Sequence, residues 1–80
     1  GPIDAVKNAL NSLPGLYSHL LDYSEHALSS GSSSKAAAYV YLRAKGSAKQ
    51  EYGVGIHPNI TTATIKAIIS AMNRLYRALK

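Results

Sequence analysis

Three histidines, His19, His26 and His57, are the only side chains in this 80-residue chain that could serve as imidazole ligands or bases. No two of them stand in an H-x-H or H-x-x-x-H spacing, which would aim two rings at one metal ion. The chain also has no cysteine, which excludes thiolate metal sites and disulfides and favours an intracellular compartment. We therefore expect no metal site.

The sequence also shows no recognisable set of residues for nucleophilic or acid–base catalysis. The serines lack the G-x-S-x-G spacing of a nucleophile elbow, and Glu25 and His26 are adjacent on a predicted strand, so they point to opposite faces. Gly53-Val54-Gly55 lacks the further glycine and the lysine of a phosphate-binding loop. We predict a binding or regulatory module with no catalytic residue and no cofactor of its own.

The net charge of +5 comes from nine Lys and Arg against four Asp and Glu, and raises nucleic acid or an acidic partner as possibilities. A solvated surface is the preferred interpretation, because the basic residues are scattered along the chain. Apart from Lys66, they include Lys35, Arg43, Lys45, Lys49, Arg74, Arg77 and Lys80. No apolar run reaches 18 residues, so we expect no membrane span and no membrane partner.

Hydrophobic spacing predicts a helix followed by three strands. Residues 2–13 place apolar side chains three and four apart, as on one face of a helix. Residues 16–28 alternate with a change of parity that indicates a β-bulge near Asp22. After a serine-rich turn, residues 35–45 alternate cleanly, and a third strand contains residues 52–56.

A second helix follows the third strand, with Asn59 or Thr61 as its N-cap. Its predicted apolar stripe is Ile65, Ile68, Ile69, Met72, Leu75, Tyr76 and Leu79. The order α-β-β-β-α predicts an α+β two-layer sandwich, with both helices on one face of an antiparallel three-stranded sheet. The other face would stay open and need a partner, and we assign to it Ala37, Tyr39, Tyr41, Gly53 and Gly55.

Four stretches carry a resemblance to a known family: residues 21–27 (LDYSEHA), 36–40 (AAAYV), 53–56 (GVGI) and 60–63 (ITTA). They are similar to the C-terminal, leucine-sensing regulatory domain of the long-type 2-isopropylmalate synthases, and the similarity spans nearly all 80 residues in one collinear order. Two alternatives stay open. The related domain of citramalate synthase senses isoleucine, and a double-stranded RNA-binding domain shares the α-β-β-β-α order.

The resemblance implies a feedback module in leucine biosynthesis. L-Leucine would bind at an interface between regulatory domains and lower the activity of a TIM-barrel acyltransferase, which condenses acetyl-CoA with 2-oxoisovalerate using a divalent metal. Residues 1–80 would be one fragment of that enzyme, lacking the first three strands of the family's domain and the whole barrel. Its expected partners are a second copy, bound through the sheet face or the helices, and the barrel. Its expected location is the cytoplasm, or the mitochondrion if the source is fungal.

Site residues are also implied by the resemblance. The leucine pocket would be formed by Ile3, Leu20, Tyr23, Ala27, Ser34 and Ile60. Supporting positions would be Glu25, His26, Gly31 and Ser32. Such a pocket would enclose the isobutyl group, and discrimination against valine would rest on one methylene, worth about 1–3 kcal/mol.

Overall fold

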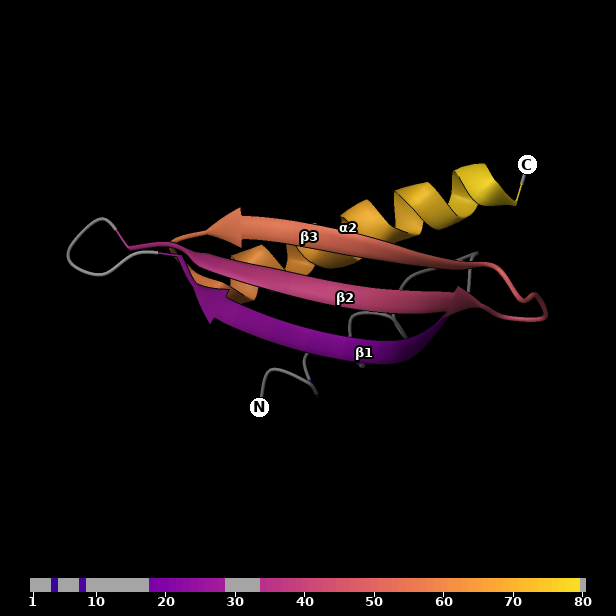
Figure 1. Ribbon diagram of the computed structural model, residues 1–80, viewed down its shortest axis with the longest axis horizontal. Helices are drawn as coiled ribbons and strands as arrows, with labels where there is room; N and C mark the ends of the chain where they lie inside the picture. The colour runs from indigo at the N-terminus through magenta and orange to yellow at the C-terminus, as the bar shows by residue number, and fades with distance from the viewer. Residues whose placement is uncertain (1–3, 5–7, 9–17, 29–33, 80) are drawn as a thin grey trace.

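The computed structural model describes residues 4, 8, 18–28 and 34–79. Within them the chain forms β1 (Ser18–Ala27), β2 (Ala36–Ala44), β3 (Gln50–His57) and α2 (Ile60–Ala78). The strands form one antiparallel sheet in the order β1-β2-β3. Figure 1 shows the sheet as one layer, with α2 lying behind β2 and β3.

This architecture confirms the α+β class, the three-stranded antiparallel sheet and the C-terminal helix on one face of it. The predicted helix over residues 2–13 lies outside the described residues, except for Asp4 and Asn8, which are helical. Among the described helices, none is long and apolar enough to cross a membrane.

The bulge predicted in β1 is confirmed. Leu20 pairs with Leu42, whereas Asp22 pairs with Tyr41, so Leu21 is the extra residue. An extra residue reverses which side chains face inward. Beyond it, Tyr23 pairs with buried Val40 and lies on the same side of the sheet as α2.

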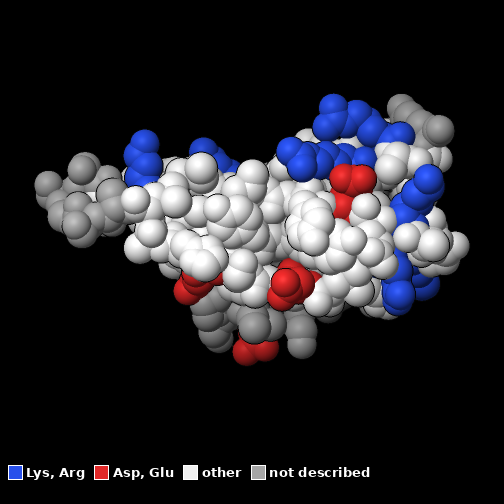
Figure 2. All heavy atoms as spheres, viewed as in Figure 1, with Lys and Arg blue, Asp and Glu red and all other residues white. Residues whose placement is uncertain are grey.

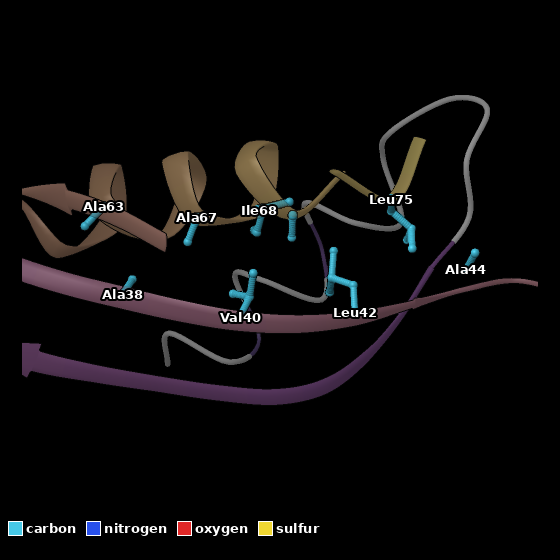
Figure 3. Packing of buried hydrophobic residues seen from close by; sticks show 9 residues of the cluster. Ala38, Val40, Leu42, Ala44, Ala63, Ala67, Ile68 and Leu75 are labelled. Atoms are coloured by element: carbon cyan, nitrogen blue, oxygen red, sulfur yellow. The ribbon is translucent and has the colours of Figure 1, made fainter. Parts of the chain in front are cut away.

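The core lies between β2 and α2. Ala38, Val40, Leu42 and Ala44 of β2 are buried against α2 (Figure 3). From α2 the buried hydrophobic residues are Ala63, Ala67, Ile68, Ala71 and Leu75. Of the predicted apolar stripe of α2, Ile68 and Leu75 are buried, and Met72 is partly buried against the core. Alanines fill the rest of the inner face, and Ile65, Ile69, Tyr76 and Leu79 are exposed.

The assignment of Gly53 and Gly55 to the open face was wrong. They pair with Val40 and Ala38, whose side chains point to α2. A Cβ on Gly53 would overlap the backbone oxygen of Ala67. The helix backbone thus approaches β3 so closely that it leaves no room for a side chain.

The opposite side of the sheet, which we call the open sheet face, carries the larger β3 side chains. Tyr39, Tyr52, Val54 and Ile56 are all exposed there. The rings of Tyr41 and Tyr52 stack with centroids 3.9 Å apart, and Tyr39 meets His26 edge-on at 5.7 Å. No described element covers this aromatic and aliphatic surface.

Candidate functional site

One end of the sheet gathers segments that are far apart in the sequence. Ala27 at the end of β1 pairs with Ala36, which pairs in turn with His57 at the end of β3. The backbone N–H of Leu28 donates to the carbonyl oxygen of Lys35 at 2.9 Å. Residues on both sides of the β1–β2 connection are thereby held beside the segment that leads into α2.

The first turn of α2 completes this end of the sheet. Asn59 is the N-cap, and its side chain accepts a hydrogen bond from the backbone N–H of Thr62 at 3.1 Å. His57 Nδ1 accepts from the backbone N–H of Asn59 at 3.0 Å and fixes the turn. The first turn holds no acidic residue, so the helix dipole presents partial positive charge here.

A pocket of about 320 Å³ opens at this end, within the size range of small-molecule sites. Its lining consists of Glu25, His26, Ala27, Ser34, Lys35, Ala36, Pro58 and Ile60. These residues include one carboxylate, one ammonium group, one hydroxyl group and an apolar wall. The arrangement suits a small zwitterion with an aliphatic side chain.

Three of the six predicted pocket residues, Ala27, Ser34 and Ile60, line this pocket, as do the supporting residues Glu25 and His26. Leu20 and Tyr23 do not line it. Leu20 pairs with Leu42 near the opposite end of β1, and both Leu20 and Tyr23 pack against the core. Ile3, Gly31 and Ser32 lie outside the described residues.

Sequence reasoning missed three lining residues: Lys35, Ala36 and Pro58. Two of them directly follow Ser34, and Pro58 stands two positions before Ile60. Adjacency to predicted site residues was therefore the available signal. The pairing of Ala27 with Ala36 brings the lining residues at the end of β1 beside those around the start of β2.

Tyr23 connects the pocket residue Glu25 with α2. Its hydroxyl donates to Glu25 Oε2 at 2.9 Å and lies 3.0 Å from Thr64 Oγ1. Because the phenol has one hydrogen and Glu25 receives it, Thr64 donates to the phenol oxygen. Burial raises the pKa of Tyr23 above its ordinary value of 10.0; the Thr64 hydrogen bond lowers it, and the hydrogen bond and charge of Glu25 raise it further.

The raised Tyr23 pKa gives a pH-dependent prediction. The folded state favours the neutral phenol, so this stabilisation is complete below the unfolded pKa of 10.0 and is lost as the pH rises through the folded value. We expect the wild-type chain to lose stability relative to Tyr23→Phe only above about pH 10. Urea unfolding of both chains from pH 8 to 11 measures the difference. Parallel stability curves throughout would contradict the expectation.

Charged side chains are unevenly distributed. Figure 2 shows Lys and Arg most densely gathered where the β2–β3 turn and the C-terminal part of α2 lie, with others toward the opposite end of the sheet. Acidic side chains lie mainly along the β1 edge. The basic residues of these segments are Lys45, Lys49, Arg74 and Arg77. The pocket lies at the opposite end of the sheet. In the part of the chain that the structure describes, no group of three or more His, Asp or Glu residues could hold a metal ion.

Comparison with known proteins decides the family. Residues 1–76 match the family described as the LeuA allosteric (dimerisation) domain. The chain belongs to this family. As a LeuA domain, it is 52% identical over 77 residues to 2-isopropylmalate synthase of Kineococcus radiotolerans, which covers 96% of the chain and 13% of that enzyme. The synthase of Thermobifida fusca is 51% identical over 74 residues, covering 92% of the chain and 12% of the enzyme.

A third relative of this LeuA domain, 2-isopropylmalate synthase of Clostridium acetobutylicum, is 49% identical over 74 residues, or 92% of the chain and 13% of the enzyme. The chain therefore spans about an eighth of the length of these relatives. The resemblance drawn from the four motifs is confirmed. The family is that of an allosteric domain and not of the RNA-binding alternative.

Proposed function

We propose that this LeuA domain is a feedback-regulatory module that binds L-leucine in the pocket beside the start of α2. The observation that carries the proposal is the composition of one pocket, which joins Glu25 and Lys35 to the apolar side chains of Ala27, Pro58 and Ile60. Free leucine carries an ammonium, a carboxylate and an isobutyl group. Oppositely charged groups in a largely apolar pocket are what recognition of such a ligand requires.

Selectivity would rest on the shape of the apolar wall. Loss of one methylene, as in valine, is worth about 1–3 kcal/mol in a hydrophobic pocket. Isoleucine has the same atoms as leucine with the branch one carbon closer to the backbone, so it is the competing ligand that the citramalate synthase alternative predicts. Titration with all three amino acids separates these alternatives, and we expect leucine to bind most tightly.

A tryptophan at position 27 provides the test of the pocket. Ala27 is exposed and lines the pocket, so Ala27→Trp should fill the pocket without disturbing the core. We expect leucine binding, measured by isothermal titration calorimetry, to weaken at least about tenfold, which corresponds to 1.4 kcal/mol. The matched control is Ala48→Trp, because Ala48 is exposed and lies in the β2–β3 turn away from the pocket. Equal leucine affinity in the two variants would count against this pocket.

In the complete enzyme, the proposed role is allosteric. The relatives are named 2-isopropylmalate synthases, and we propose that this domain lowers the activity of such an acyltransferase when leucine is bound. Leucine would act by binding one arrangement of the regulatory and catalytic domains more tightly than another. The divalent metal would belong to the catalytic domain. Since the relatives are bacterial, we propose a cytoplasmic location.

The partner that we propose for the open sheet face is a second copy of the chain. The family description includes dimerisation, and the described residues offer two exposed apolar surfaces, this face and the outer stripe of α2. Basic residues flank the α2 stripe at Lys66, Arg74 and Arg77, and α2 contains no acidic residue. Two α2 helices packed antiparallel about Met72 would bring Lys66 close to the partner's Arg77. Like charges at that position disfavour self-association through α2.

Lysine substitutions on the two surfaces distinguish them. Val54→Lys would bury an unpaired ammonium group in a dimer formed through the open sheet face, and should raise the dimer dissociation constant at least about 100-fold. Ile69→Lys adds the same charge to the exposed stripe of α2 and serves as the control. Sedimentation equilibrium of both variants measures the effect. A dimer that is lost only in Ile69→Lys would place the interface on α2 instead.

A further inference from the structure

The position of Glu25 at the edge of the sheet makes its carboxylate available to a ligand. Glu25 pairs with buried Ala38, so its side chain lies on the same side of the sheet as α2. However, α2 packs over β2 and β3 and not over β1, and Glu25 remains exposed. The carboxylate is therefore on the inner side of the sheet without being buried, and it lines the pocket.

Two hydroxyl groups hold this carboxylate in place. Thr64 is a buried polar residue on α2, with 5% of its surface exposed, and its Oγ1 lies 3.0 Å from the Tyr23 hydroxyl. Tyr23 in turn donates to Glu25 Oε2 at 2.9 Å. The hydrogen bonds therefore run in one direction, from α2 through Tyr23 to Glu25. A carboxylate accepts about four hydrogen bonds, so Oε1 can accept further donors.

We propose that Glu25 binds the ammonium group of the amino-acid ligand, and that Tyr23 and Thr64 are positioning residues that orient Glu25 without contacting the ligand. This inference rests on the proposed function. Among the described residues that line the pocket, Glu25 is the only carboxylate. Hydrogen bonds between charged partners are roughly twice as strong as neutral ones.

The carboxylate of the same ligand has a separate region of the pocket. Lys35 supplies an ammonium group, and α2 begins at Ile60 with no acidic residue in its first turn. Both features favour an anion near the start of α2. The two ends of a zwitterion would therefore be recognised by different segments. Glu25 of β1 would bind the ammonium, and Lys35, directly before β2, would bind the carboxylate together with the start of α2.

The proposed contact between the Glu25 carboxylate and the ligand ammonium is tested by removing each partner in turn, the negative charge of Glu25 and the ammonium group of the ligand. Wild type should bind leucine at least about tenfold more tightly than 4-methylpentanoate, which keeps the isobutyl group and carboxylate but lacks the ammonium. Glu25→Gln should weaken leucine binding by about 10–100-fold, as expected for a charged hydrogen bond, and leave 4-methylpentanoate within about twofold. Calorimetry measures the leucine affinity, and NMR titration at millimolar concentration measures that of 4-methylpentanoate.

The positioning role has its own variants. Tyr23→Phe and Thr64→Val each remove one hydroxyl and should weaken leucine binding about 3–10-fold without affecting 4-methylpentanoate, in proportion to one hydrogen bond. Thr64→Ser keeps the hydroxyl and should restore the leucine affinity. If the role of these hydroxyl groups were purely structural, the variants would weaken the binding of both ligands equally, and Thr64→Ser would not restore the leucine affinity.

Each outcome bears on the inference. The inference would be overturned if Glu25→Gln weakened the binding of leucine and of 4-methylpentanoate equally, or if it did not weaken leucine binding. The proposal that leucine binds in this pocket would not be affected by either result. If wild type binds no leucine, the proposed function fails and the inference fails with it. The inference is supported if Glu25→Gln weakens the binding of leucine but not that of 4-methylpentanoate, and if Thr64→Ser keeps the leucine affinity that Thr64→Val loses.

Discussion

Replacing Gly53 by alanine is expected to destabilise the domain by about 3 kcal/mol or more, the upper range for overpacking a core. A Cβ at this position would overlap the backbone oxygen of Ala67 and the backbone nitrogen of Ala71, and would lie 2.7 Å from Ala71 Cβ. Backbone atoms cannot be relieved by a change of rotamer, so α2 would have to move away from β3. Gly55→Ala meets the backbone oxygen of Ala63 in the same way and should behave alike.

The control for this prediction is Gly46→Asn. Gly46 has a φ of +73° and no atom within 4 Å of an added Cβ. Asparagine tolerates this left-handed conformation, so the change should cost about 1 kcal/mol or less. Urea unfolding gives the free energy of each variant. If Gly53→Ala were no less stable than Gly46→Asn, the close packing of α2 on β3 would be refuted.

Truncating Leu75 is the second change with a large expected effect. Leu75 and Leu42 are both 0% exposed and are among the largest fully buried side chains of the described core (Figure 3). Leu75→Ala removes buried methyl groups and leaves a cavity that the alanine-rich helix cannot fill. We expect a loss of about 2–5 kcal/mol in the free energy of unfolding.

Leu79→Ala is the matched control, because Leu79 follows α2 directly and is 42% exposed. The same deletion of atoms there should cost less than about 1 kcal/mol. Thermal and urea unfolding of the two variants give the comparison. Similar losses at positions 75 and 79 would mean that the C-terminal half of α2 is not held by this core.

Some features of the fold could be predicted because they depend on local sequence. The clean alternation around Val40 and Leu42 identified β2, the change of parity identified the bulge before Asp22, and Asn59 was one of two N-caps proposed. Each of these follows from spacing or from the hydrogen bonding of one residue with its near neighbours.

The errors concern which side of an element meets its partner. Alternation shows that Gly53 and Gly55 share one side of β3 but not which side faces α2. The predicted apolar stripe of α2 includes Ile65 and Ile69, which are exposed, whereas Ala67 and Ala71 form part of the inner face. Small residues form the interface because the helix and strand backbones are in close contact, and that distance is a tertiary property.

The candidate site could be predicted only in part. Resemblance pointed to Ala27, Ser34 and Ile60, which lie together around one pocket. Lys35 and Pro58 were missed, because their place in the lining depends on strand register and on the turn into α2. The hydrogen bond between Tyr23 and Thr64 joins residues 41 positions apart, and no local pattern indicates it.

The most direct test of leucine recognition is a two-dimensional ¹H–¹⁵N NMR titration of the labelled 80-residue chain with L-leucine. We expect saturable shifts centred on Glu25, Ala27, Lys35 and Ile60, with little change in the β2–β3 turn at residues 45–49. An absence of shifts up to millimolar leucine, or saturable shifts confined to residues outside the pocket, would contradict leucine binding at the start of α2.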